Sequence, residues 1–103
     1  KLRCIAAHLG NWGDWDLEKI RPLAKLPNVY TDISSSFSYV TDKAPLYPIL
    51  RAYDPKHVFF GSDYPIWCPK KELDKALELG LEQDFLEDIL FNNFAAFYHY
   101  KEL

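Results

Sequence analysis

Three short apolar runs, separated by segments of helical periodicity, constrain this sequence more than any other feature. The runs lie at Leu2–Ala7, Val29–Ile33 and His57–Phe60. Each is too short for a helix, and its β-branched and aromatic residues favour a strand. Strands that alternate with helices every ~30 to 40 residues indicate parallel pairing through right-handed crossovers. The sequence therefore predicts an α/β fold of about three βα units, with strands covered on both faces of the sheet.

The segments that follow these runs carry apolar residues at helical spacing and recognisable end signals. Pro69 suits the first turn of a helix, and Gly80 suits the position just after its end. Asp84 is expected to cap a final amphipathic helix whose apolar side chains, including Phe94 and Tyr98, face inward. Four helices are expected, over residues 17–26, 46–53, 69–79 and 84–98. Residues 1–103 thus form a single segment in the order β-α-β-α-β-α-α.

Composition narrows the classes of function. The chain has 103 residues, of which 49% are apolar and 17% aromatic, so it can form one domain with a core. Its net charge is −3, and the single basic doublet, Lys70-Lys71, is followed by Glu72, whereas nucleic-acid binding needs clustered basic residues. No apolar run approaches the ~20 residues that cross a bilayer, and no secretory signal pattern is present. We therefore expect a cytoplasmic protein with no nucleic-acid or membrane partner.

Two polar residues follow apolar runs at the ends where parallel α/β folds gather their reactive groups. His8 follows the first run, and Asp63 follows the third. The imidazole of His8 can move a proton or bind a metal, or it can simply hydrogen-bond a backbone carbonyl. Asp63 is either a metal ligand, since a carboxylate in apolar surroundings needs a cation, or a cap of local N–H groups. The residues alone leave both alternatives open.

Aromatic residues lie in the two loops beside these candidates. Trp12 follows His8 and Trp67 follows Asp63, so both are candidate walls of a pocket for a small organic substrate. They can equally serve to plug the loops. His57 begins its strand at the opposite rim, so we assign it to structure.

Three stretches together carry a resemblance to a known family. They are Ile5-Ala-Ala-His-Leu-Gly10, Asn28-Val-Tyr-Thr-Asp-Ile-Ser34 and Val58-Phe-Phe-Gly-Ser-Asp-Tyr-Pro65. The chain resembles the amidohydrolase superfamily of TIM-barrel metal-dependent hydrolases, and within it the branch that also holds non-oxidative decarboxylases. The resemblance covers nearly the whole chain. It implies that the three strands are the sixth, seventh and eighth of a (β/α)8 barrel, so that residues 1–103 form its C-terminal portion.

The resemblance also implies roles for the two candidates. Asp63 matches the metal-ligating aspartate of the last strand, and His8 matches the histidine of the sixth, a ligand or a general acid/base. In the parent protein a divalent metal, zinc by expectation, activates water. The family's glycine pair is half present, because Asn11 follows Gly10. Its histidines of strands one and five fall outside this chain, and catalytic zinc takes three protein ligands. The chain alone is therefore expected to bind metal weakly or not at all, and to be inactive.

Several interpretations stay open. The first is a fragment of a hydrolase, and the second is a non-oxidative decarboxylase of the same superfamily. The third is a non-catalytic remnant or interaction module, although the absence of Met favours truncation of an enzyme. A flavodoxin-like domain is disfavoured because no Gly-rich loop follows any strand. Three strands cut from a barrel leave open edges, so self-association or pairing with the missing barrel half is expected.

Overall fold

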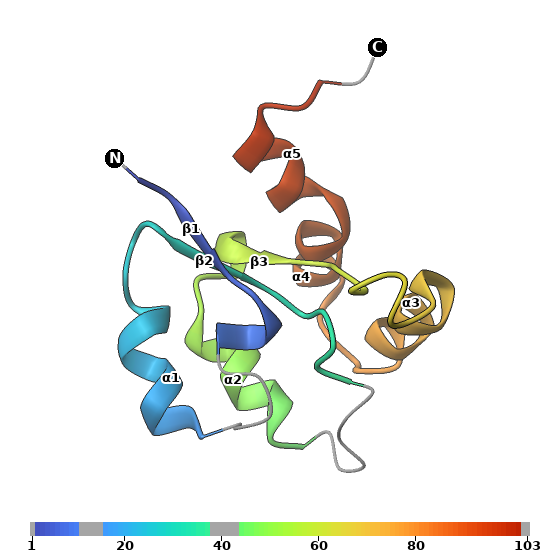
Figure 1. The fold of residues 1–103 in the computed structure, drawn as a ribbon, viewed down its shortest axis with the longest axis horizontal. Helices are drawn as coiled ribbons and strands as arrows, with labels where there is room; N and C mark the ends of the chain where they lie inside the picture. Colours follow the sequence, from blue (N-terminus) through green and yellow to red (C-terminus); the bar gives the residue numbers. More distant parts are fainter. Residues whose placement is uncertain (1, 11–15, 38–43, 102–103) are drawn as a thin grey trace.

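A sheet of three parallel strands organises the structure, a computed structural model that describes residues 2–10, 16–37 and 44–101 (Figure 1). The strands are β1 (Cys4–Ala6), β2 (Val29–Asp32) and β3 (Val58–Phe59), in the order β1-β2-β3. Cys4 pairs with Val29, and Thr31 pairs with Val58. The predicted α/β fold with parallel strands is therefore confirmed.

Helices follow each strand, as predicted. Asp16 caps the first of them, because its Oδ1 accepts a hydrogen bond of 3.0 Å from the backbone N–H of Glu18. The helix α1 packs against α2, and the segment η3 packs against β3. The helical segments are η1 (His8–Gly10), α1 (Leu17–Ala24), α2 (Leu46–Ala52), η2 (Pro55–His57), α3 (Pro69–Leu77), α4 (Gln83–Glu87), η3 (Asp88–Asn92) and α5 (Asn93–Tyr98). No helix among the described residues has the length and apolar character that crossing a bilayer requires.

The core lies where α1, α2 and the closing helices meet the sheet. Each fully buried Leu or Ile side chain there stabilises the fold by about 2 kcal/mol relative to an exposed one. The largest aliphatic side chains with less than 2% exposure are Leu9, Ile20, Ile33, Leu46, Ile49, Leu50, Val58 and Ile89. These residues come from every part of the chain, so the three βα units share one core.

The strand β1 departs from the expectation of a sheet covered on both faces. Cys4 and Ile5 are exposed, because β1 forms one edge of the described sheet and has a strand neighbour on one side only. Arg3 lies at this edge, where its Nη1 donates to the carbonyl oxygen of Phe97 at 2.8 Å. Its guanidinium carbon lies 3.8 Å from the centre of the Phe97 ring. The apolar run thus forms a strand, but the prediction that it is buried was wrong.

The final helical region also differs from its prediction. It begins after Glu82 rather than at Asp84, and no side chain caps it. Phe85 is buried as predicted, whereas Phe94 and Tyr98 are exposed. The five residues of η3 form a π-helical turn, which shifts the helical phase of everything that follows. Helical spacing counted from α4 therefore assigns the wrong face to α5.

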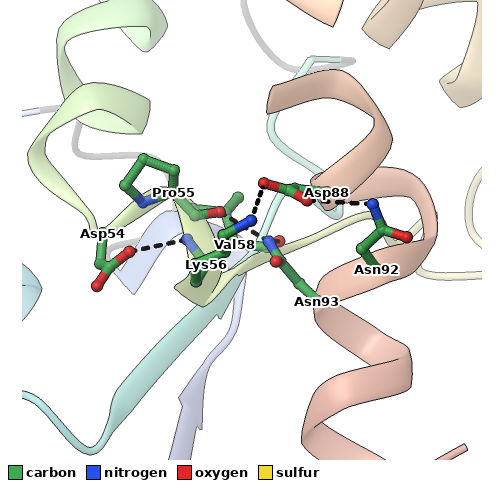
Figure 2. Close-up of polar contacts among 7 residues, drawn as sticks. All are labelled: Asp54, Pro55, Lys56, Val58, Asp88, Asn92 and Asn93. Atoms are coloured by element: carbon green, nitrogen blue, oxygen red, sulfur yellow. Dashed lines mark hydrogen bonds and ion pairs between the residues drawn. The ribbon is translucent and has the colours of Figure 1, made fainter. Parts of the chain in front are cut away.

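Polar contacts tie the start of β3 to η3 and α5 (Figure 2). The Nζ of Lys56 lies 2.7 Å from Oδ2 of Asp88, and this hydrogen bond holds the pKa of the Asp88 carboxyl below its ordinary value. The Nδ2 of buried Asn93 donates to the carbonyl oxygens of Pro55 and Val58, at 2.7 and 2.8 Å. We call Lys56, Asp88 and Asn93 the lower network, because they lie at the edge where the strands begin.

Candidate functional site

A left-handed turn places His8 at the edge of the sheet where the strands end. His8, Leu9 and Gly10 have φ values of 57°, 58° and 85°, in the region that favours glycine. A Cβ at Gly10 would lie 2.5 Å from the hydroxyl oxygen of Tyr53 and 2.8 Å from Cδ2 of Leu23, so only glycine fits. The Tyr53 hydroxyl donates to the carbonyl oxygen of Leu9 at 3.1 Å. Burial raises the pKa of Tyr53, which keeps this donor protonated.

Residues at and just after the end of β2 hold both the backbone and the ring of His8. The Oδ1 of Asp32 accepts from the backbone N–H of His8 and from that of Ser34, each at 3.1 Å. It also accepts a hydrogen bond from the Ser34 hydroxyl. The ring Nδ1 of His8 lies 2.8 Å from the carbonyl oxygen of Ser34 and 2.9 Å from its Oγ. Asp32 and Ser34 therefore fix the position of the half-buried His8 ring.

Asp63 stands in the turn after β3, with a φ of 59°. The turn closes through its backbone, because the Asp63 carbonyl accepts from the N–H of Ile66 at 2.9 Å. The carboxylate instead reaches the neighbouring strand end, where Oδ2 accepts from Ser35 Oγ at 2.7 Å. Ser35 in turn accepts from Nε1 of Trp67 at 2.9 Å. The Asp63 side chain is thus held by a donor from the turn after β2, which differs from a cap of its own turn.

Consecutive serines link the two candidates. Ser34 contacts His8 and Ser35 contacts Asp63, and the positive φ of Ser35, 55°, turns the chain between them. A Cβ at Gly61 would lie 3.4 Å from Cβ of Ser34, so the end of β3 runs close beside this turn. We call His8, Asp32, Ser34, Ser35 and Asp63 the upper network. It brings His8 and Asp63 to the same edge, as the sequence predicted.

Sequence reasoning missed the parts of this network that come from β2. It gave Ser34 to Ser36 no role, yet all three are buried, with exposed fractions of 6%, 2% and 0%. A usable signal was present. Three small hydroxyl residues follow directly after a carboxylate at a strand end, and buried hydroxyls need hydrogen-bond partners.

The two predicted tryptophans have different outcomes. Trp12 lies outside the described residues. Trp67 is half-buried and lies above the strand ends, where it donates to Ser35 and sits 6.0 Å from Nζ of Lys75, measured to the ring centre. Its role as a pocket wall stays a prediction. His57 lies at the opposite edge, with Nδ1 3.0 Å from the Val29 carbonyl oxygen, in agreement with a structural role.

The donors at the upper network fit part of a metal site. His8 offers a ring nitrogen and Asp63 a carboxylate oxygen, both ligand types that zinc accepts. Within residues 2–10, 16–37 and 44–101, no group of three or more His, Cys, Asp or Glu side chains could hold a metal ion. Because a catalytic zinc takes three protein ligands, the described residues do not complete such a site.

The sequence was compared with models of known protein families and with curated proteins. Residues 1–100 match the family model described as Amidohydrolase. No curated protein matches the chain.

Solved structures share the fold at low sequence identity. The chain is similar to amidohydrolase 2 from Bifidobacterium longum subsp. infantis, with a TM-score of 0.73 and 24% identity over 97% of this chain and 41% of that one. It is similar to 2,6-dihydroxybenzoate decarboxylase from Rhizobium (TM-score 0.72, 16% identity, 95% of this chain and 35% of that one). It is also similar to 5-carboxyvanillate decarboxylase from Sphingomonas paucimobilis (TM-score 0.70, 18% identity, 97% and 34%). The chain thus spans only 34 to 41% of the length of these structures.

Proposed function

This chain belongs to the Amidohydrolase family, and from that premise we propose that it forms strands six to eight of a metal-dependent hydrolase barrel. The substrate class is a small organic molecule attacked by activated water. One observation carries the proposal: the turn at Ser34 and Ser35 holds His8 and Asp63 at the same edge of the sheet. Parallel α/β folds carry their reactive groups at that edge.

The residues of this chain have distinct tasks in the proposal. A divalent metal, zinc by our sequence-based expectation, supplies Lewis acidity when bound. Asp63 contributes a carboxylate oxygen to it, while Ser35 fixes the direction of the carboxylate through Oδ2. His8 binds the metal or moves a proton at its ring. Trp67 lines the substrate side, and the sequence-based expectation gives the same role to Trp12, which lies outside the described residues. Co-ligands come from the remainder of the barrel, so this chain alone is inactive.

A decarboxylase is the second candidate. Two of the similar solved structures are decarboxylases of hydroxylated aromatic acids by their names, with TM-scores of 0.72 and 0.70. Both candidates need a polarising metal and a positioned proton-transfer group, so they share His8 and Asp63. The two reactions can be told apart, because decarboxylation releases carbon dioxide, whereas hydrolysis consumes water and releases none.

We also propose that the exposed edge of β1 pairs with another strand, either from the missing barrel half or from a second copy. Leu2 and Ile5 are 77% and 39% exposed there, beside a strand whose outer side has no neighbour in the described sheet. An uncovered edge templates association. The far edge is partly closed, because the N–H of Phe60 donates to the carbonyl of Ile89 at 2.8 Å. Sedimentation as a well-folded monomer at micromolar concentration would count against this pairing.

The reading frame upstream of Lys1 provides the test of function. A frame that continues through an N-terminal His-x-His motif supplies the whole barrel for assay, whereas a start codon near Lys1 favours the non-catalytic remnant. The whole barrel should act on a panel of lactones, amides and hydroxybenzoates only when loaded with metal. Carbon dioxide release would select the decarboxylase. Cytoplasmic location stays a prediction.

The Asp63→Asn variant tests the site within that barrel. It removes the charged ligand and should abolish the metal-dependent activity. Asp54→Asn is the matched control, because Asp54 is an exposed aspartate that caps η2 through the N–H of Lys56 at 2.9 Å. The site assignment fails if Asp63→Asn keeps both metal content and activity.

A further inference from the structure

Asp32 gathers three hydrogen bonds on a single carboxylate oxygen at the end of β2. Its Oδ1 accepts from the backbone N–H groups of His8 and Ser34, both at 3.1 Å, and from the Ser34 hydroxyl. A charged acceptor makes stronger hydrogen bonds than a neutral one. Ser34 therefore donates its single hydroxyl proton to Asp32.

This hydrogen bond determines how Ser34 contacts the imidazole ring of His8. Because its proton points at Asp32, Ser34 Oγ presents only lone pairs to Nδ1 of His8, 2.9 Å away. The Ser34 carbonyl oxygen, 2.8 Å from the same Nδ1, can only accept as well. Two acceptors that face one ring nitrogen require a proton on it. A neutral imidazole carries one proton, so its lone pair then lies on Nε2.

We propose that Asp32 is a positioning residue that acts through Ser34 to hold His8 as the Nδ1–H tautomer, which puts the lone pair of the ring on Nε2. Asp32 does not touch substrate in this role. The inference deepens the proposed function, on which its importance to the site rests, because only Nε2 of such a ring can bind a metal or accept a proton. A hydrogen bond at the other ring nitrogen sets the tautomer of many metal-binding histidines.

The tautomer can be measured without metal or activity. Long-range proton–nitrogen correlation spectra of the chain labelled with 15N-histidine, recorded in alkaline buffer, assign the proton to one ring nitrogen. His57 is an internal reference, because its Nδ1 faces the carbonyl oxygen of Val29 at 3.0 Å rather than Ser34 or Asp32. We expect His8 and His57 both to be Nδ1–H in the wild type. An Nε2–H majority at His8 overturns the proposal at once.

Variants then measure the effect of Asp32 on the tautomer of His8. Asp32→Ala releases the Ser34 hydroxyl to donate to the ring, and the Nε2–H share of His8 should rise roughly fivefold, the factor expected for losing one ordinary hydrogen bond. Asp32→Asn should restore the wild-type ratio, because an amide oxygen can accept in the same place. Thr31→Val removes a buried hydroxyl that bonds the Ala6 carbonyl at 2.6 Å, and it should leave His8 unchanged.

Folding is checked by the backbone amide spectrum of each variant. Where Asp32→Ala does not fold, Ser34→Ala takes its place, since it removes the Oγ acceptor and should raise the Nε2–H share of His8 in the same direction. A folded Asp32→Ala or Ser34→Ala with the wild-type ratio overturns the proposal. If the tautomer behaves as expected but the whole barrel binds no metal, the proposed function fails while this inference stands.

Discussion

The two edges of the sheet both carry polar networks, but these networks differ in backbone geometry. In the lower network, Asn93 and Lys56 satisfy carbonyl and carboxylate groups from segments with ordinary helical or extended backbone (Figure 2). In the upper network, His8, Ser35 and Asp63 all have positive φ. Such conformations cost about 1 kcal/mol or more for residues other than glycine. The lower edge therefore stabilises the fold, whereas the upper edge holds His8 and Asp63 in place at a cost in stability.

Gly10 provides the largest expected effect on the upper side. Gly10→Ala forces a Cβ to within 2.5 Å of the Tyr53 hydroxyl at a φ of 85°, and should destabilise the fold by about 3 kcal/mol, from strain and crowding together. Gly80 is the matched control. It has a φ of 70° with nothing within 4 Å of the added Cβ, so Gly80→Ala should cost only about 1 kcal/mol. Urea unfolding measures both, and equal losses would contradict the account of the His8 turn.

Asn93 tests the lower side. Asn93→Ala leaves two carbonyl oxygens, of Pro55 and Val58, without their shared donor, and should destabilise the fold by about 2 kcal/mol. Asn92→Ala is the neighbouring control, since Asn92 is exposed and its Nδ2 donates to Oδ1 of Asp88 at 3.2 Å. Its cost should stay within about 0.5 kcal/mol. Metal binding should be unchanged in both variants, and a change would contradict the claim that only the upper edge takes part in metal binding.

Asp88 gives a smaller, pH-dependent effect. Its pKa is lowered in the fold by Lys56, so the carboxylate adds stability above the unfolded-state pKa of about 4 and loses it as the pH falls below that value. Lys56 is largely exposed, so we expect Asp88→Asn to cost below about 1 kcal/mol at pH 7. The difference from wild type should shrink at pH 3. In a Lys56→Met background the pH dependence should become smaller, because only the hydrogen bond from Asn92 to Oδ1 of Asp88 then lowers the pKa of Asp88, and an unchanged pH dependence would contradict the role of Lys56.

The sequence predicted local elements well and contacts between them less well. The apolar runs and the spacing near Leu46 located strands and helices, because those signals are local. The exposure of Ile5 depends on a neighbouring strand, and the inward face of α5 depends on the π-turn at η3, which no short-range spacing encodes. The site was predicted in the same way. His8 and Asp63 stand out at strand ends, whereas Ser35 becomes a donor to Asp63 only once β2 and β3 are paired in register.

The central claim, that the upper edge is part of a metal site, is tested most directly by equilibrium dialysis of the whole barrel against Zn²⁺. Wild type, Asp63→Asn and Asp54→Asn are compared, so that one aspartate is removed from each edge. In the whole barrel, loss of one ligand should lower the affinity for zinc by roughly tenfold or more. We predict this loss for Asp63→Asn and none for Asp54→Asn. Equal zinc binding by all three proteins would contradict the account and leave Asp63 as a structural carboxylate held by Ser35.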